Sequence, residues 1–290
     1  MPQDNKILSM TNNIIRMVAM DCDGTLFSKH GRISEYGASV LKQLKERGIL
    51  VVICTGRPLY SIQRALSSDL YDYAVLNNGM QSAKNNGEII EDKRKLLPEE
   101  IREITRCCER FNVMMSVSYD DDFHHFTSKK HHLYVSSVQR LKNLARKMLG
   151  RKLWHDDMHS DYGKLESYQI DKICFSGTNA ALRKLSQSLD HAKYSVLFVS
   201  SNWLEIMPHG VSKGAALLKI MEIENIAKEE CAAFGDGEND LSMLEAAGCP
   251  VAMKNAMPSL KEAAAYVTEE HCADDGCAKW IDAHILQNHG

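Results

Sequence analysis

Two carboxylates whose spacing suits chemistry, Asp21 and Asp23, follow directly after a short apolar run at residues 14–20. Residues two apart in an extended segment point the same way, and the ligands of an open parallel sheet collect at the carboxyl ends of its strands. Two acids there repel each other unless a cation or a shared proton lies between them. Mg²⁺ suits this position, because it binds one or two carboxylates together with phosphate oxygens and water. Taken alone, the motif could also be a strand-end turn in which aspartate is the turn former.

A second acidic group comes late in the chain, where Asp236 and Asp240 lie on either side of Asn239 after a predicted strand at residues 231–234. These residue types are also typical of a helix N-terminus, with Asn239 or Asp240 as its cap. The two interpretations are compatible, since a helix N-terminus can border a site. Thr55 ends a third predicted strand. Two acidic strand ends and Thr55 in one sheet therefore predict a three-sided site.

Lys213 adds a cation to this set, at the start of a predicted helix that Ser212 caps. A cation beside helix N-terminal amides favours an anion such as phosphate. A lysine in a first helical turn is usually just solvated, so its significance depends on the carboxylates that accompany it.

The elements that must position these residues alternate between short apolar strands and amphipathic helices. The pattern of strand, helix, strand, helix, strand with short connections is typical of a parallel sheet. In chain order these elements cover residues 14–20, 34–48, 49–54, 58–68 and 73–76.

The middle of the chain has a different pattern, with longer polar connections between mixed strands and helices. It is predicted to contain a hairpin turn at Asn86-Gly87, a helix after Pro98, strands at 113–117, 169–175 and 195–199, and helices at 141–149 and 180–189. The parallel-sheet pattern then resumes, with a helix from Ser212, strands at 231–234, 250–253 and 266–268, and a last helix at 278–286. We therefore expect an α/β core, residues 1–83 and 208–290, with an inserted α+β domain at 84–207.

Composition excludes several classes of function. The 290 residues are 44% hydrophobic with a net charge of −3, which is ordinary for a globular protein. Lys and Arg number 35 against 38 Asp and Glu, whereas electrostatic binding of nucleic acid needs a basic excess. No apolar stretch is long enough to cross a bilayer, and the N-terminus does not resemble a signal peptide. Nine cysteines without C-x-x-C spacing are typical of a reducing compartment. We expect a cytoplasmic protein without nucleic-acid or membrane partners; its oligomeric state stays open.

Four motifs in this order resemble those of the haloacid dehalogenase (HAD) superfamily of phosphohydrolases. They are D-x-D-G-T-L at 21–26, T-G-R at 55–57, Lys213 within G-V-S-K-G, and G-D-x-x-N-D at 235–240. The insertion between the second and third motifs resembles the class IIB cap of the Cof-type subfamily, and the resemblance covers residues 14–290. It implies a Rossmann-like core at 1–83 and 208–290 and a cap domain at 84–207.

The resemblance also implies a role for each motif residue. Asp21 would be the nucleophile that takes the phosphoryl group, and Asp23 would be the general acid and then the base. Asp21, the backbone carbonyl of Asp23, and Asp236 would bind Mg²⁺. The phosphate- and substrate-binding residues would be Thr55, Gly56, Arg57, Lys213 and Asn239, and Asp240 would orient the site together with Asn239. For Arg57 a second interpretation stays open, in which it only completes the turn after its strand.

The expected function is a Mg²⁺-dependent phosphatase of small phosphorylated metabolites. Sugar phosphates, a phosphorylated cofactor such as pyridoxal phosphate or flavin mononucleotide, and nucleotides all stay open as substrates. A phosphomutase or phosphotransferase would carry the same core motifs. A non-enzymatic regulatory binder of phosphometabolites is the third alternative, but binding alone needs no nucleophile. The cap is expected to close over the site and to select the substrate.

The inserted domain is rich in histidine. Since the spacings fit no common ligand motif, we favour exposed polar surface over a transition-metal site, and some of them could contact an anionic substrate. Trp154 and Trp203 could line a cavity, although packing is the more common role for an aromatic residue. The histidines are His124, His125, His131, His132, His155 and His159.

Overall fold

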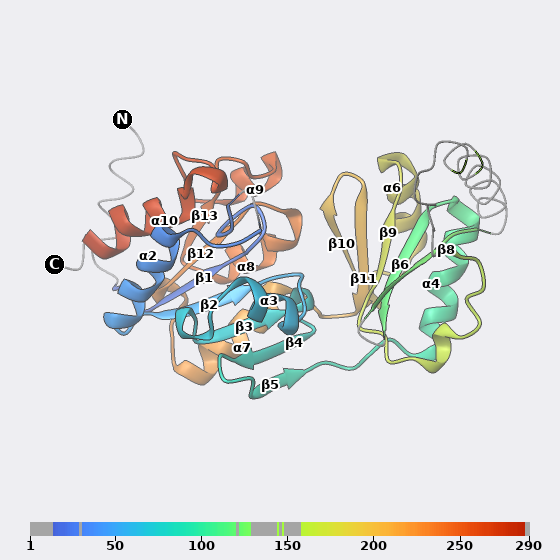
Figure 1. Ribbon diagram of the computed structural model, residues 1–290, viewed down its shortest axis with the longest axis horizontal. Helices are drawn as coiled ribbons and strands as arrows, with labels where there is room; N and C mark the ends of the chain where they lie inside the picture. The colour runs from blue at the N-terminus through green and yellow to red at the C-terminus, as the bar shows by residue number, and fades with distance from the viewer. Residues whose placement is uncertain are drawn as a thin grey trace. The chain divides into compact units, whose positions relative to one another are not determined.

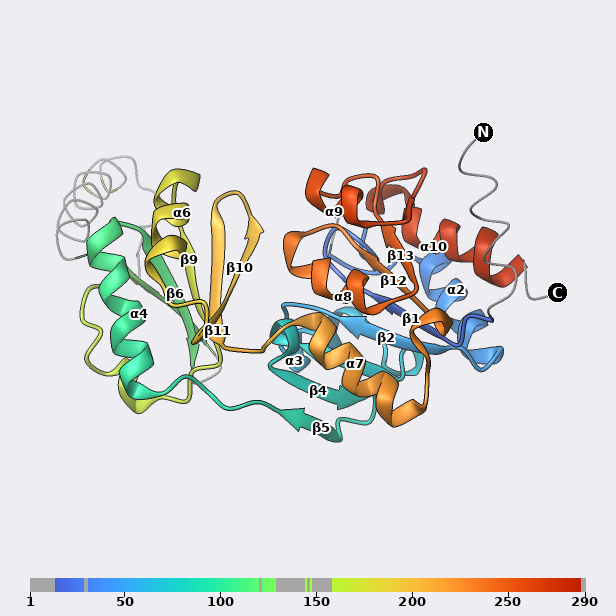
Figure 2. The same ribbon diagram turned by 180° about the vertical axis from the view of Figure 1, so that it is seen from behind.

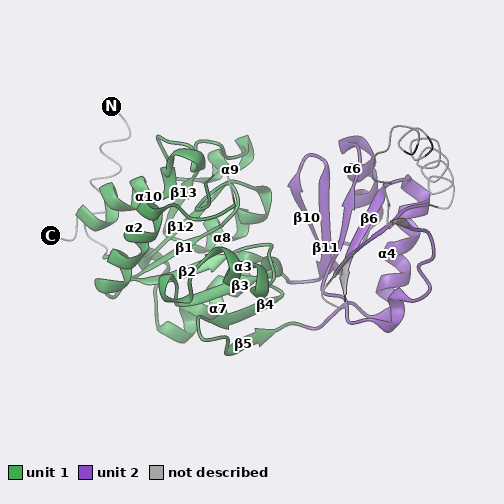
Figure 3. Ribbon diagram, viewed as in Figure 1, with its two compact units in different colours: residues 1–93, 211–290 green, residues 94–210 purple. Residues whose placement is uncertain are grey.

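The computed structural model describes residues 14–28, 31–119, 122–128, 144, 147 and 158–287. The chain forms two compact units (Figure 3), unit 1 from residues 1–93 and 211–290, and unit 2 from residues 94–210. Each unit has its own sheet and its own hydrophobic core.

Unit 1 is built on a sheet of eight strands in the order β14-β13-β12-β1-β2-β3-β4-β5 (Figure 1). The pairs from β14 to β3 are parallel, and β4 and β5 are added antiparallel at one edge. The strands are β1 (Met17–Met20), β2 (Leu50–Cys54), β3 (Tyr73–Leu76), β4 (Gln81–Lys84), β5 (Ile89–Asp92), β12 (Cys231–Gly235), β13 (Cys249–Ala252) and β14 (Tyr266–Val267).

Helices cover both faces of this sheet, which is why its central strands are apolar throughout rather than alternating. Figures 1 and 2 show α2 and α7 on opposite sides of it. The hydroxyl of Ser34 caps α2 by accepting from the backbone N–H of Gly37 at 2.8 Å, as its residue type predicts. The helices are α2 (Glu35–Glu46), α3 (Leu59–Ala65), α7 (Lys213–Glu224), α8 (Leu241–Ala246), α9 (Pro258–Ala263) and α10 (Gly276–Ile281).

The predicted α/β class is confirmed, and each strand predicted in unit 1 is present within a few residues of its expected limits. The first unit boundary lies at residues 93 and 94 rather than at 84. The reason is the predicted Asn86-Gly87 turn, which joins β4 to β5 with Gly87 at a φ of 88°. Because β4 pairs with β3, this hairpin extends the sheet of unit 1.

Unit 2 is a six-stranded sheet in the order β10-β11-β9-β6-β7-β8, with α4 (Pro98–Phe111) and α6 (Asn179–Ser188) packed on it. Ile104 of α4, Leu185 of α6 and Phe175 of β9 belong to one buried apolar cluster. The strands are β6 (Met114–Tyr119), β7 (Asp122–Phe126), β8 (Met158–His159), β9 (Ile173–Ser176), β10 (Tyr194–Ser200) and β11 (Trp203–Pro208).

Three strands of unit 2, β7, β8 and β11, lie outside the predicted set. The sequence of β7, DFHHF, is too polar to be recognised as a strand from its pattern. The predicted helix at 141–149 lies almost wholly outside the described residues, and so do His131, His132, His155 and Trp154. All nine cysteines are described, and all are free thiols. Among the helices of the described ranges, none is long and apolar enough to cross a membrane.

Candidate active site

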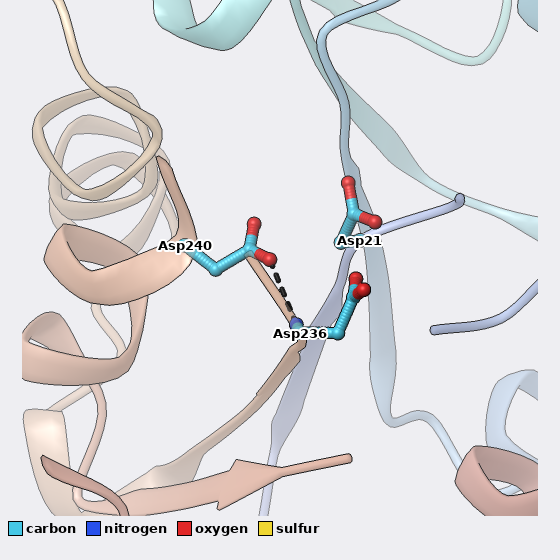
Figure 4. Close-up of side chains that lie close together, drawn as sticks. All are labelled: Asp21, Asp236 and Asp240. Carbon is cyan, nitrogen blue, oxygen red and sulfur yellow. Dashed lines mark hydrogen bonds between the residues drawn. The ribbon is translucent and has the colours of Figure 1, made fainter. Parts of the chain in front are cut away.

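The carboxyl ends of β1 and β12 bring the two predicted acidic groups together. The strands are parallel neighbours, and the backbone N–H of Asp21 donates to the carbonyl of Phe234 at 3.0 Å. Asp21, Asp236 and Asp240 each offer a carboxylate oxygen, and these oxygens lie within 4.8 Å of one another. Figure 4 shows Asp21 and Asp236 at the ends of the two strands and Asp240 at the start of the helix that follows, with the three side chains close together. The predicted meeting of the two acidic motifs is therefore present in the structure.

Lys213 joins this cluster from the first turn of α7, and its side chain is fully buried. Its Nζ donates to Oδ1 of Asp21 at 2.6 Å and to Oδ1 of Asp240 at 2.5 Å. Ser212 fixes the start of the helix, because its hydroxyl accepts from the backbone N–H of Ala215 at 3.1 Å. The lysine is thus a structural part of the acidic cluster and not a solvated side chain.

Close packing of the backbone at Gly79 against the backbone at Ser212 positions Lys213 in the acidic cluster. Gly79 has a φ of 100°, and a Cβ at this position would lie 2.2 Å from the carbonyl oxygen of Ser212. Only glycine allows the turn after β3 to approach the start of α7 so closely.

Charge is unbalanced in the cluster, since three carboxylates face one ammonium. Burial is the main reason why the pKa of Asp21 is raised well above its usual value; Lys213 opposes this shift, and Asp240 and Asp236 add to it. Burial and the charge of Asp240 raise the pKa of Asp236 to about 7, against a hydrogen bond from Thr25. Burial alone would lower the pKa of Lys213, but the attraction of Asp21 and Asp240 outweighs burial and raises it. A divalent cation bound here would remove the excess of negative charge.

Asp240 organises the loop that carries Asp236. Its Oδ2 accepts from the backbone N–H groups of Asp236 at 2.9 Å and of Gly237 at 3.0 Å, while its Oδ1 contacts Lys213. Both oxygens are therefore engaged by the protein. Asp21 and Asp236 are therefore the carboxylates that could hold a metal ion, and oxygen ligands of this kind fit Mg²⁺.

The loop after β1 leaves little space beside Asp236. Gly24 has a φ of 84°, and a Cβ there would lie 2.3 Å from Oδ2 of Asp236. The hydroxyl of Thr25 donates to Oδ1 of the same carboxylate at 3.2 Å. The D-x-D-G-T segment therefore positions Asp236 as well as its own two aspartates.

The predicted residues after β2 lie in one tight turn. Thr55 is buried, and its hydroxyl accepts a hydrogen bond from the backbone N–H of Arg57 at 3.1 Å. Its backbone carbonyl accepts one from the backbone N–H of Asn78 at 2.9 Å. The space above Gly56 is bounded by the side chain of Asn78, whose atoms would lie 3.3 Å from an added Cβ. The Arg57 guanidinium is directed to Asp23, and both oxygens of Asp23 accept hydrogen bonds from it.

Two asparagines contact the predicted residues. Asn239 donates to Oδ1 of Asn78 at 3.0 Å, and both side chains are buried. Asn78 could have been found, because Asn77 and Asn78 directly follow the predicted strand at residues 73–76. Sequence reasoning missed Asn255, whose side chain donates to the carbonyl of Gly24 at 2.7 Å. Its position shortly after a predicted strand gave no signal of this contact.

The histidines that the structure describes in unit 2 form no metal-binding group with other ligand residues; the group of Asp21, Asp236 and Asp240 is the one found within the described ranges. Nδ1 of His125 lies 2.8 Å from the hydroxyl of Ser116. Trp203 donates to Oε1 of Glu205 at 3.2 Å. None of these contacts tests whether the residues meet a substrate.

Comparison with known proteins agrees with this geometry. Residues 18–281 match the family model of the haloacid dehalogenase-like hydrolases. An HMP-PP phosphatase of Escherichia fergusonii is 28% identical over 282 residues, which cover 94% of this chain and 96% of the relative. The 5-amino-6-(5-phospho-D-ribitylamino)uracil phosphatase YwtE of Bacillus subtilis is 30% identical over 283 residues, which cover 92% of this chain and 97% of the relative.

Solved structures show the same fold. A subclass IIB sugar phosphatase of the HAD superfamily superimposes with a TM-score of 0.73, covering 92% of this chain and 98% of the other at 22% identity. A protein of Thermotoga maritima, TM0651, gives a TM-score of 0.66 at 27% identity, and the match covers 93% of this chain and 97% of the other.

Proposed function

Because the chain belongs to the haloacid dehalogenase-like hydrolase family and is a phosphatase, we propose that it hydrolyses small phosphorylated metabolites by way of a phosphoryl group carried on Asp21, with Mg²⁺ as cofactor. The observation that carries this proposal is the buried contact of Lys213 with Asp21 and Asp240, with Asp236 beside it. A binding module would need neither a nucleophile nor this excess of carboxylates.

In the first step, Oδ2 of Asp21 attacks phosphorus, and the bond between phosphorus and the leaving oxygen breaks. Lys213 holds Oδ1 of the same carboxylate, so the attacking oxygen is oriented before substrate arrives. Phosphoryl transfer depends mainly on positioning and on neutralisation of charge, and the buried ammonium of Lys213 provides both.

In the second step, water attacks the phosphoryl group on Asp21 and releases phosphate. Asp23 gives a proton to the leaving oxygen in the first step and takes one from water in the second. Its position suits this exchange, because it lies two residues after Asp21 in the same turn that follows β1.

Asp21, Asp236 and the carbonyl of Asp23 are the groups proposed to hold Mg²⁺. When bound, the ion neutralises charge on the transferring phosphoryl group. Thr55, Gly56, Arg57, Lys213 and Asn239 are proposed to bind the phosphate or the substrate, and Asp240 orients the cluster.

The names of the two relatives support small phosphorylated metabolites as the class of substrate. Both are named for small phosphorylated metabolites, one a diphosphate and one a ribitylaminouracil phosphate. We assign the choice of substrate to the inserted domain, predicted at residues 84–207 and represented in the structure by unit 2, residues 94–210. Energy gained by binding the non-phosphate part of a substrate can be used to position its phosphoryl group.

A phosphate-release screen with Mg²⁺ tests this function. The panel contains sugar phosphates, pyridoxal phosphate, flavin mononucleotide, nucleotides and the compounds for which the two relatives are named, and release well above background is expected for at least one. Mass spectrometry after rapid quench should place the phosphoryl group on the peptide that contains Asp21. Absence of release from every ester would contradict the proposal.

A further inference from the structure

Asp23 and Arg57 form a two-point ion pair beside the proposed nucleophile. Nε of Arg57 donates to Oδ2 of Asp23 at 2.6 Å, and Nη2 donates to Oδ1. Arg57 comes from the turn after β2, and Asp23 from the loop after β1. Planar guanidinium and carboxylate groups joined in this way have a fixed relative orientation, which a single contact would not give.

The loop after β1 also packs against the face of the Arg57 guanidinium. The guanidinium carbon of Arg57 lies 5.2 Å from the centroid of the Phe27 ring. A Cβ at Gly31 would lie 3.3 Å from Nη2 of Arg57, so the loop leaves little space there. Asp23 and Phe27 are themselves joined by a β-bridge. The same short segment therefore supplies both the carboxylate and the surface on which its partner packs.

This pairing suits one of the two proposed roles of Asp23. A carboxyl group that must give a proton needs that proton on one of its oxygens, whereas here both oxygens accept from Arg57. A carboxylate that takes a proton from water acts as an acceptor, and the two-point contact with Arg57 fixes the orientation in which it does so. A carboxylate has about four lone-pair sites, so the two contacts with Arg57 leave sites at which a proton of water can be accepted.

We propose that Arg57 is a positioning residue for Asp23, and that it orients this carboxylate for the hydrolysis of the phosphoryl group on Asp21. This inference rests on the proposed function. In that step a bond forms between the oxygen of water and phosphorus, the bond between phosphorus and the Asp21 oxygen breaks, and a proton of water passes to Asp23. Arg57 leaves the first step, formation of phosphorylated Asp21, largely unchanged when the leaving group needs no proton.

The test separates the two steps with 4-nitrophenyl phosphate, whose leaving group departs without protonation. Rapid-quench measurements on the full chain give the rate at which Asp21 is labelled and the rate at which the label decays. In Arg57→Gln we expect decay to slow by about tenfold or more, since general base catalysis is worth ~10²-fold or more, while labelling stays close to the wild-type rate. Arg57→Lys should also slow decay, because an ammonium cannot make the planar two-point contact.

Three further measurements exclude a merely structural effect. Arg102→Gln removes a similar two-point pair, with Glu166 in unit 2, and should change neither rate. Guanidinium ion at millimolar concentration should restore decay in Arg57→Ala. In an Asp23→Asn background, Arg57→Gln should have no further effect on decay, since coupled residues give non-additive changes.

Equal slowing of labelling and decay in Arg57→Gln would overturn the inference, and so would a rise in KM with both rates unchanged, which would make Arg57 a phosphate-binding residue only. Either result would leave the proposed function standing. A wild-type chain that releases phosphate without any labelling of Asp21 would overturn the proposed mechanism and this inference with it.

Discussion

Each unit of the molecule contains a lysine paired with carboxylate in its interior. In unit 1, Lys213 contacts Asp21 and Asp240. In unit 2, Nζ of Lys172 lies 3.0 Å from both oxygens of Glu205. In both cases burial alone would lower the lysine pKa, and the neighbouring carboxylates outweigh burial and raise it. By burial and pKa alone, the two clusters would be hard to tell apart.

Their charge balance differs. The charges around Lys172 balance, because Lys172 pairs with Glu205, and Asp171, which also raises the pKa of Lys172, pairs with Lys95 at 2.7 Å. Oε1 of Glu205 also accepts from the indole of Trp203 and lies 3.7 Å from the thiol of Cys174. Glu205 lies within the paired strands β9 and β11, and Lys172 directly precedes β9. The cluster around Lys213 lies where strands end, and Asp236 gives it an unmatched charge. Unbalanced charge at strand ends, rather than a buried ion pair, distinguishes the proposed active site.

The strongest test of this difference is a matched pair of amide substitutions. Asp21→Asn should leave a folded protein whose turnover falls by several orders of magnitude, about 10⁴-fold or more, because an amide is a very poor nucleophile. Glu205→Gln removes the corresponding charge in unit 2 and should leave turnover of a small aryl phosphate near the wild-type value. Steady-state kinetics of both variants, with circular dichroism as the control for folding, decide the matter. An Asp21→Asn variant with a tenth of wild-type activity would exclude Asp21 as the nucleophile.

Removal of metal should act on the Lys213 cluster alone. Chelation is expected to abolish turnover, because the unmatched carboxylates of Asp21 and Asp236 then face the substrate phosphate without a cation. Mg²⁺ should restore activity, and Ca²⁺ should restore it poorly, since it prefers a larger and looser shell. Activity is measured in chelated buffer and after addition of each ion. Full turnover in metal-free buffer would show that the acidic cluster needs no metal.

Two glycines allow a smaller perturbation of the same cluster. Gly24 and Gly87 have φ values of 84° and 88°, so alanine causes similar backbone strain at both. Only at Gly24 would the new Cβ meet the carboxylate of Asp236; at Gly87 nothing lies within 4 Å. We expect Gly24→Ala to lower kcat/KM by about 100-fold through displacement of Asp236, and Gly87→Ala to leave it unchanged. Similar losses in both variants would attribute the effect to backbone strain.

The smallest effect on turnover is expected for the balanced cluster. Lys172→Met leaves the buried carboxylate of Glu205 without its cation and should lower the free energy of unfolding by about 3 kcal/mol. The double variant Lys172→Met/Glu205→Met should recover most of this loss, because apolar side chains of similar volume replace the pair. Denaturant unfolding measures stability, and turnover of an aryl phosphate is followed in parallel. A large loss of turnover in the folded double variant would show that this cluster also belongs to the active site.

The sequence by itself determined the class of fold and the main members of the site. Apolar runs and helix caps located the strands of unit 1, and the residues after those runs had to meet at one edge because parallel strands end on the same side. The resemblance to the HAD superfamily, drawn from four motifs, is confirmed by the family match over residues 18–281. Asp21, Asp236, Asp240 and Lys213 were expected together and lie together.

The tertiary structure alone decided which side chains pair. Sequence reasoning left Arg57 between a substrate contact and a turn residue, whereas the fold directs it to Asp23, 34 residues away. Asn255 meets Gly24 across 231 residues, and the β4–β5 hairpin stays with the sheet of unit 1. Local patterns report periodicity, caps and strand ends, because these depend on neighbours in the chain. The partner of a polar side chain depends on which distant segments pack beside it, and that is settled only when the whole core forms.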